Sequence, residues 1–228
     1  MATWCRVSKV LDSNADPVAR LVWRNSQPSA LRAGCKVLKI DFEGHTELHG
    51  SLSAAFQRLP KLATLDLKGT KVSGDLAMLT MCNELTVLDL SGTKITGDLN
   101  ALANMVGLKR LRLGHSKVVG SLNALAKTVE LEYLDLSQTR VSGHLKALQN
   151  ARELRRLQLS DTKVEGNIKA LKKATELENL ELENANVFGN MSSLREAKAL
   201  KHVDISGTQI AGARSSARYL RDIQLDQS

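Results

Sequence analysis

Histidine is the side chain used most often for acid–base catalysis near neutral pH, and it is also a common zinc ligand. His45 and His49 flank Glu47, which could suggest a metal site, but further ligands are missing nearby and a stretched loop explains the three residues equally well. No phosphate-binding loop, hydrolase nucleophile motif or zinc-finger spacing accompanies them. We therefore expect no enzyme activity, no catalytic residue, no metal, no cofactor and no small-molecule substrate. The five histidines are His45, His49, His115, His144 and His202.

The three cysteines, Cys5, Cys35 and Cys82, are an odd number and lie far apart. This pattern argues against a disulfide framework and favours a reducing compartment. The N-terminal residues have no uninterrupted apolar stretch of the secretory type, and no segment approaches the roughly 20 apolar residues of a membrane span. We expect an intracellular, cytoplasmic protein without a membrane span, and organelle targeting stays open.

A second group of residues has the chemistry of a binding surface. Arginine and tyrosine contribute strongly to affinity at protein interfaces, and they gather in the middle of this chain between more acidic flanks. The group predicts a site for a protein partner, which could itself be acidic. Alternatively, its acidic and basic members simply pair across strands on a solvated sheet. The candidate partner-binding residues are Arg110, Arg112, His115, Tyr133, Arg156, Asp89 and Asp135.

Five basic residues recur at a constant spacing of 23 and form what we call the basic ridge. The basic ridge consists of Lys71, Lys94, Lys117, Arg140 and Lys163. Such a row could bind a polyanion or an acidic partner with salt-sensitive affinity, or it could be ordinary solubilising cover over apolar turns. The net charge is only +8, from 32 basic and 24 acidic residues, so nucleic-acid binding is the weaker expectation.

Both groups depend on a repeat that fills most of the chain. A 23-residue phrase with the consensus LxxLxLxxTxVxGxLxxL begins at Leu62, Leu85, Leu108, Leu131, Leu154, Leu177 and Leu200. Residues two apart, such as Leu65 and Leu67, share one face of a strand. The glycine at the thirteenth position permits a tight turn, and leucines three apart, such as Leu76 and Leu79, indicate a short helical return. A stretched copy with two extra residues begins at Val37.

The phrase resembles the leucine-rich repeat, and the glycine after a hydrophobic residue resembles its plant-specific subclass, although the proline of that subclass is absent. The resemblance implies an α/β fold, a right-handed solenoid with a curved parallel sheet on the concave side and short helices or 3-10 turns on the convex side. It also implies a non-enzymatic protein–protein interaction module, a scaffold or adaptor that binds its partner on the concave face. Binding of a polyanion or nucleic acid by the basic ridge is the alternative.

Three parts are expected along the chain. Residues 1–36 form an N-terminal capping segment with a short amphipathic helix that Asp16 and Pro17 begin, residues 37–222 form a solenoid of eight units, and residues 223–228 form a C-terminal tail or cap. Ile223 and Leu225 could add one more edge strand. Where leucine-rich repeats usually have asparagine, this chain has a column of threonine or serine, and we expect its hydroxyls to link neighbouring turns as a ladder, broken at Ala185.

Overall fold

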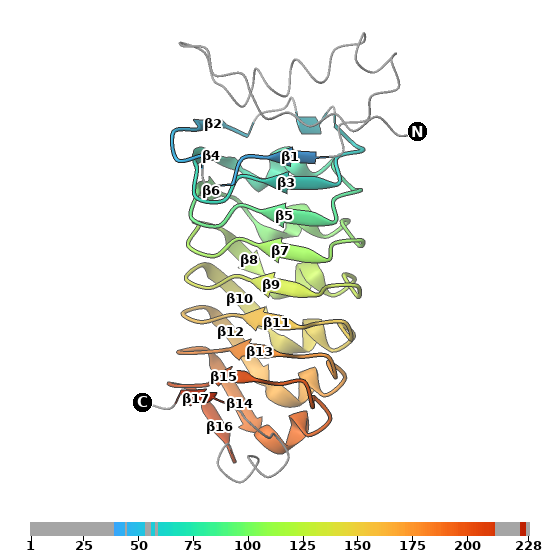
Figure 1. The fold of residues 1–228 in the computed structure, drawn as a ribbon, viewed down its shortest axis with the longest axis vertical. Coiled ribbons are helices and arrows are strands. Elements are labelled where there is room, and N and C mark those ends of the chain that lie inside the picture. Colours follow the sequence, from blue (N-terminus) through green and yellow to red (C-terminus); the bar gives the residue numbers. More distant parts are fainter. Residues whose placement is uncertain (1–38, 44, 53–55, 58, 213–223, 227–228) are drawn as a thin grey trace.

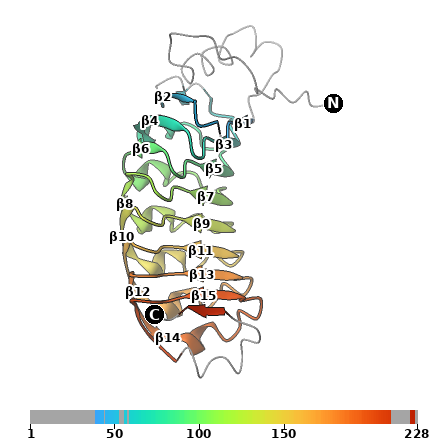
Figure 2. The ribbon, with the colours of Figure 1, turned by 60° about the vertical axis from the view of Figure 1, so that its left-hand side comes forward.

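The chain folds into a stack of parallel strands, which confirms the predicted solenoid (Figure 1). The structure is a computed structural model, and it describes residues 39–43, 45–52, 56–57, 59–212 and 224–226. The predicted N-terminal capping helix lies outside the described residues. Figure 2 shows that the stack bends gently, with one long sheet on the inner side of the bend.

The long sheet has nine parallel strands of three residues each. Every strand pairs with the strand of the next repeat in the same register, so that Leu88, Leu111 and Leu134 lie side by side. We call the exposed side of this sheet the concave face. Its strands are β1 (Lys39–Asp41), β3 (Thr64–Asp66), β5 (Val87–Asp89), β7 (Arg110–Arg112), β9 (Tyr133–Asp135), β11 (Arg156–Gln158), β13 (Asn179–Glu181), β15 (His202–Asp204) and β17 (Gln224–Asp226).

A second layer of parallel strands follows the turn in each repeat. It divides into a three-stranded and a five-stranded sheet, and a single bridge between Asp98 and Val119 connects the two. The first sheet contains β2 (His49–Ser51), β4 (Lys71–Asp75) and β6 (Lys94–Thr96). The second contains β8 (Val119–Ser121), β10 (Arg140–His144), β12 (Lys163–Asn167), β14 (Asn186–Asn190) and β16 (Gln209–Ala211).

Short 3-10 helices close the second to the seventh repeat on the convex side, as the leucine spacing predicts. Most begin after a residue whose side chain accepts a hydrogen bond from the backbone two residues on, as Asp75 does from Ala77 N at 2.8 Å. The named helices are η2 (Leu76–Leu79), η3 (Leu99–Leu102), η4 (Leu122–Leu125), η5 (Leu145–Leu148), η6 (Ile168–Leu171) and η7 (Met191–Leu194).

The leucines of the consensus form one continuous core between the layers, because a single repeat cannot bury its apolar edge without neighbours. Cys82 belongs to this core, and its thiol donates a hydrogen bond to the carbonyl of Phe56. Burial raises the pKa of the Cys82 thiol to about 11. The residue is therefore a packing residue and not a nucleophile.

The threonine column does not link neighbouring repeats, and the predicted hydroxyl ladder is wrong. Each hydroxyl donates to the carbonyl three residues earlier in its own repeat, as Thr93 does to Leu90 at 2.6 Å. The short threonine side chain reaches its own turn first. The turns are linked instead by backbone bonds, such as the one from Gly92 N to Gly114 O at 2.9 Å. The remaining hydroxyls of this kind are those of Thr70, Ser116, Thr139, Thr162 and Thr208.

The residue before the threonine column has a left-handed backbone in every repeat from the second to the eighth. Three of these residues are glycines, but repeats four to seven have His115, Gln138, Asp161 and Asn184, with φ between 52° and 58°. A side chain in this conformation costs about 1 to 2 kcal/mol, less for asparagine and aspartate. Histidine and glutamine in the fourth and fifth repeats therefore occupy positions where glycine would be less strained, and the aspartate and asparagine of the sixth and seventh repeats carry a smaller cost.

At the C-terminal end, the edge strand expected around Leu225 is present as β17. Leu225 lies opposite Val203 of β15, and the pairing is parallel like the others. The offset between these two residues is 22 instead of 23, so the last repeat is one residue shorter.

Candidate partner-binding site

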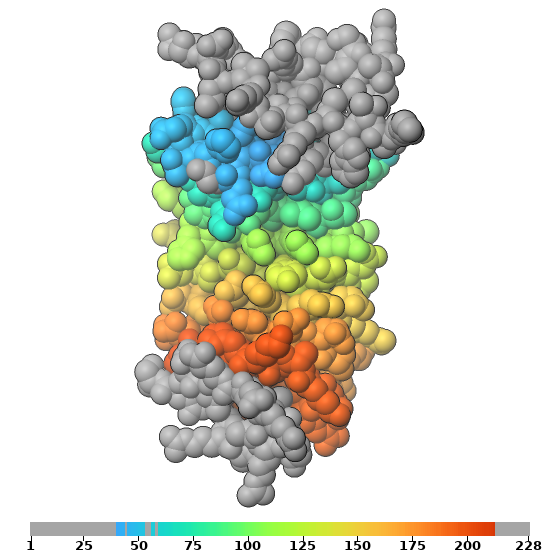
Figure 3. Space-filling view, in the orientation of Figure 1, coloured from blue at the N-terminus to red at the C-terminus, as the bar shows by residue number. Residues whose placement is uncertain are grey.

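The concave face displays one pattern from β3 to β15. The middle residue of each strand is buried in the core, and the first residue is partly or fully exposed. The space-filling view of this face shows each repeat as a band across the molecule (Figure 3). Residues at equivalent positions therefore form columns that cross the bands, as the sequence predicts.

Tyr133 lies at the centre of this face and is surrounded by three guanidinium groups. The register places Arg110 on β7 and Arg156 on β11 directly beside it. The guanidinium carbons of Arg110, Arg112 and Arg156 lie 5.0, 5.5 and 5.4 Å from the ring centroid. All three are cation–π contacts, which hold the ring and the arginines in place. We call Arg110, Arg112, Tyr133 and Arg156 the arginine-tyrosine patch.

The positive charge of the patch is only partly neutralised. Arg112 pairs with Asp89 at 3.3 Å, and the Asp89 side chain is 3% exposed. Arg110 reaches Glu132 only at 4.0 Å, and their side chains are 50% and 30% exposed. Within the described part of the chain, Arg156 forms no ion pair. The patch therefore retains an excess of positive charge that a bound anion could neutralise.

Asp89 and Asp135, which the sequence analysis places among the partner-binding residues, differ in position: Asp89 is buried beneath the patch, and Asp135 is partly exposed beside it. The buried carboxylate of Asp89 also accepts the backbone N–H of Ser91 at 3.0 Å. Asp135 accepts the N–H and the hydroxyl of Ser137 at 2.9 and 2.6 Å. A Cβ at Gly114 would lie 2.7 Å from the Asp135 carboxylate, so the glycine makes room for it. Asp89 therefore positions Arg112 from below, whereas Asp135 is held by Ser137.

A shallow hollow of about 360 Å³ opens beside the patch. Its lining includes Arg112, Tyr133, Asp135, Arg156 and Gln158, and His115 stands at its edge on the turn after β7. The structure thus brings together the five predicted residues Arg110, Arg112, His115, Tyr133 and Arg156. Sequence reasoning missed Gln158 as a lining residue, because glutamine in a strand carries no distinctive signal.

Acidic residues flank the patch on both sides, as the sequence predicts. Toward the C-terminal end, Glu181 accepts a hydrogen bond from the Gln158 amide at 2.8 Å and lies 4.0 Å from His202. Toward the N-terminal end, burial raises the pKa of the Asp66 carboxyl, and the nearby carboxylates of Asp89, Glu43 and Asp41 raise it further. A hydrogen bond from the Lys68 N–H opposes these effects without cancelling them.

Replacing Asp66 with asparagine is expected to stabilise the chain at pH 7. The amide oxygen can still accept the bond from Lys68, while the penalised charge is removed. The folded-state pKa of Asp66 is raised above the ordinary 3.8, so the charged carboxylate lowers the stability of the fold at pH values above the folded-state pKa. At pH values below 3.8 the carboxyl is protonated in the folded and the unfolded state, and this cost disappears. Urea unfolding of both proteins should therefore give a gap in unfolding free energy that narrows as the pH falls toward 3.8. A gap that widens on acidification would contradict the assignment.

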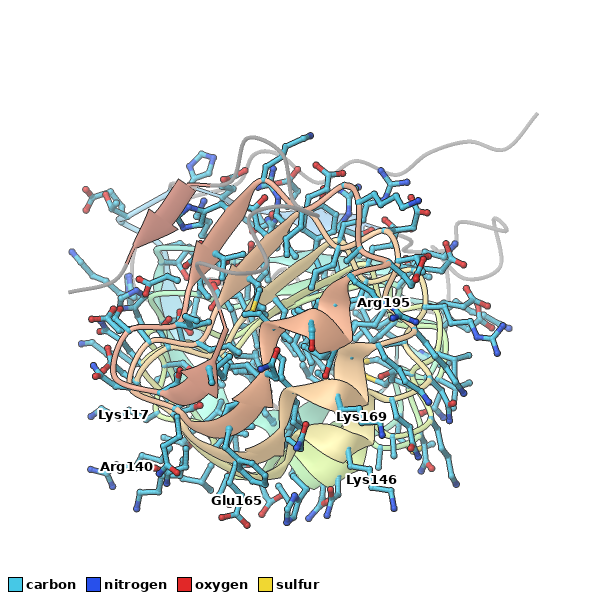
Figure 4. The ribbon with its side chains drawn as sticks, turned by 90° about the horizontal axis from the view of Figure 1, so that it is seen from below. Lys117, Arg140, Lys146, Glu165, Lys169 and Arg195 are labelled. Carbon is cyan, nitrogen blue, oxygen red and sulfur yellow. The ribbon has the colours of Figure 1, made fainter. Side chains whose placement is uncertain are left out.

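The basic ridge lies at the corner where each repeat turns from the concave sheet into the second layer. All five side chains are exposed, and none of them forms an ion pair with another described residue. Viewed along the stack, Lys117 and Arg140 point outward at this corner, away from Lys146 and Lys169 on the helical side (Figure 4). Between Lys117 and Arg140 lies a second hollow of about 590 Å³, whose lining also includes Gln138 and Asp161.

The histidines of the first repeat have local contacts. His45 packs edge-on against Phe42 with ring centroids 5.7 Å apart, and His49 Nδ1 lies 3.2 Å from the carbonyl of Glu47. Among the described residues, no group of three or more histidine, cysteine or acidic side chains is placed to hold a metal ion. In the same part of the chain, no helix has the length and apolar character of a membrane span.

Solved structures with the same architecture include plant receptor ectodomains, bacterial internalins and a plant ice-binding protein. The plant peptide hormone receptor RGFR1 in complex with RGF2 is 28% identical, with a TM-score of 0.72. The LRR ectodomain of the membrane receptor kinase GASSHO1/SCHENGEN3 from Arabidopsis thaliana, in complex with CASPARIAN STRIP INTEGRITY FACTOR 2, is 26% identical, with a TM-score of 0.66. Internalin C2 from Listeria monocytogenes is 20% identical, with a TM-score of 0.72, and shares the fold.

The extent of the match differs between these proteins. The chain is covered to 89% by RGFR1, 72% by GASSHO1 and 93% by internalin C2. It spans 34% of the RGFR1 chain and 20% of the GASSHO1 chain, so it corresponds to a part of each receptor, whereas it spans 93% of internalin C2. Neither protein-family models nor curated proteins match the sequence.

Proposed function

We propose that this chain, which is a leucine-rich-repeat protein, is a non-catalytic binding module that holds an acidic peptide segment of a protein partner on its concave face. The arginine-tyrosine patch contacts the partner's carboxylates, and the hollow of about 360 Å³ beside it accepts the neighbouring residues. Charge-assisted hydrogen bonds from arginine to carboxylate are among the stronger polar interactions in proteins.

One observation carries this proposal. Three guanidinium groups lie within 5.5 Å of the centroid of a single tyrosine ring on the exposed side of a rigid sheet, and the described acidic residues neutralise them incompletely. Like charges held this close repel one another, so the arrangement costs stability in the free protein. A carboxylate from a partner offsets that repulsion. The arginines are already oriented by the ring, which lowers the entropy cost of binding.

The comparisons support the general class of function. RGFR1 and GASSHO1 are plant receptors whose structures contain a bound partner, RGF2 in one and CASPARIAN STRIP INTEGRITY FACTOR 2 in the other. Fold alone does not determine a ligand, so the acidic character of the partner rests on the charges of this chain.

Fluorescence anisotropy with a labelled 12-residue peptide of alternating glutamate and glycine tests the proposal. The full chain should bind this peptide at low ionic strength, and a rise from about 20 to 200 mM salt should weaken binding because the contacts are charged. A matched peptide with glutamine in place of glutamate is the control and should not bind measurably. Equal binding of both peptides would overturn the proposal.

Binding of a nucleic acid or another polyanion by the basic ridge is the second candidate function. Five exposed cations without ion pairs among the described residues, about 4.8 Å apart along the stack, favour it. Comparison of a 12-nucleotide single-stranded DNA with the acidic peptide at low salt separates the candidates, and binding of the DNA should also fall steeply as salt is added. Tight binding of this DNA together with weak binding of the acidic peptide would favour the second candidate.

A further inference from the structure

The residues directly before the threonine column form a rim between the concave face and the basic ridge. Four repeats have a side chain at this position, where the backbone favours glycine. His115, Gln138, Asp161 and Asn184 all have left-handed backbones, whereas the equivalent residues of the second, third and eighth repeats are glycines. All four side chains are exposed, so none of them stabilises the core. Strained positions of this kind are retained most often at functional sites.

The same residues border both hollows of the molecule. His115 lines the hollow beside Tyr133, while Gln138 and Asp161 line the hollow between Lys117 and Arg140. His115 and Lys117 are separated by one residue, Ser116, which itself lines the second hollow. The two hollows are therefore neighbours across the rim, and the strained side chains lie between them.

The chemistry of the second hollow complements that of the first. Two cations, Lys117 and Arg140, face it without an ion pair to any described residue. The Gln138 amide can donate to a carboxylate or a carbonyl, and Asp161 can accept from a peptide N–H. Asp161 is held in place by Asn184, whose amide donates to it at 2.9 Å. Cations together with a donor and an acceptor suit an acidic polypeptide.

A nucleic acid fits the second hollow less well. Binding of single strands relies on aromatic side chains on which bases stack, and the lining of this hollow contains no aromatic residue. The nearest candidate on the concave face, Tyr133, already has three guanidinium groups around its ring.

We infer that the binding surface turns over the rim at repeats four to six, so that one acidic peptide covers both the arginine-tyrosine patch and the hollow between Lys117 and Arg140. This inference rests on the proposed function and extends it. It explains why the rim retains His115, Gln138 and Asp161 in place of glycine. An extended 12-residue peptide reaches about 40 Å, which is ample for both hollows.

The test uses the full chain and the labelled glutamate-glycine peptide. The double variant Lys117→Gln/Arg140→Gln should bind it at least 10-fold more weakly than the unmodified chain. The matched control, Lys71→Gln/Lys163→Gln, removes the same charge from the same column but from residues that do not line the hollow, and it should lose less than 3-fold. Equal losses in both variants would show a diffuse electrostatic effect and would overturn the inference.

A second variant separates contact from charge. Gln138→Gly should raise the melting temperature, because it relieves the left-handed backbone, and should still weaken peptide binding about 3-fold or more. Asn184→Gly should change the melting temperature less, because asparagine tolerates the left-handed backbone and its bond to Asp161 is lost, and should affect binding less, since Asn184 reaches the hollow only through Asp161. A more stable Gln138→Gly protein with unchanged affinity would overturn the inference.

The outcomes distinguish the inference from the function it extends. If reversing Arg110 and Arg156 abolishes peptide binding while Lys117→Gln/Arg140→Gln leaves it intact, the proposed function stands and the inference fails. If the unmodified chain does not bind the peptide, both fail. If the 12-nucleotide DNA binds more tightly than the peptide and depends on Lys117 and Arg140, the hollow is a polyanion site and the acidic peptide is the wrong partner.

Discussion

Replacing Gly120 with alanine is expected to destabilise the chain by about 2 to 6 kcal/mol, which is enough to unfold many domains. Gly120 has φ 108°, and a Cβ at this residue would lie 2.8 Å from the backbone nitrogen of Leu99 and 2.5 Å from Oδ1 of Asp98 in the preceding repeat. That oxygen accepts the backbone N–H of Asn100 at 2.8 Å and cannot move freely. Two repeats would have to separate to admit one methyl group.

Gly107 provides the matched control for this prediction. It lies in the turn before β7 without a left-handed φ, and a Cβ there would meet nothing within 4 Å. Gly107→Ala should be neutral or slightly stabilising. Thermal and urea unfolding followed by circular dichroism would measure both variants. A Gly120→Ala protein as stable as Gly107→Ala would contradict the close packing of repeats on which the columns of the concave face depend.

Reversing two charges of the arginine-tyrosine patch should have the largest effect on binding. Arg110→Glu/Arg156→Glu is expected to weaken binding of the glutamate-glycine peptide by about 100-fold or more, since a hydrogen bond to a charged group contributes about 1.5 to 3 kcal/mol and 1.4 kcal/mol is a factor of ten. Both arginines are exposed, so folding should be preserved. Arg112 is left unchanged because its loss would strand the buried carboxylate of Asp89.

The control for this prediction reverses two lysines on the convex side. Lys146 and Lys169 are exposed residues of η5 and η6. They lie on a different side of the stack from Lys117 and Arg140 (Figure 4). Lys146→Glu/Lys169→Glu changes the net charge by the same amount as the patch variant. It should reduce peptide affinity only through the overall charge, by a few-fold at most. Equal losses in the two variants would mean that the patch has no special role.

The fold was predictable because the sequence repeats without a slip. The spacing of 23 residues determines which side chains are neighbours. The adjacency of Tyr133 to Arg110 and Arg156 could therefore be predicted from their equivalent positions in three consecutive repeats. A register shared by all strands leaves no freedom at these positions. The short helical returns were predictable for the same reason, from leucines three residues apart.

Local detail was less predictable, because it depends on the reach of individual side chains. The threonine hydroxyls bind their own turns since the side chain is one atom shorter than asparagine. Asp89 and Asp135 were expected on the surface with the arginines; Asp135 is partly exposed and lines the hollow, but Asp89 is buried, and its carboxylate accepts a backbone N–H two residues on. The left-handed rim was also missed. Its only signal in the sequence is that the second, third and eighth repeats have glycine at the position that His115, Gln138, Asp161 and Asn184 occupy in the other repeats.

The most direct test of binding on the concave face is a nuclear magnetic resonance titration of the isotope-labelled chain with the glutamate-glycine peptide. Amide resonances of β7, β9 and β11 should shift progressively, together with the side-chain resonances of Arg110, Arg112 and Arg156. Amides of η5 and η6 should stay in place. Shifts that concentrate on the 3-10 helices, or that spread evenly over the repeats, would contradict a binding site at the arginine-tyrosine patch.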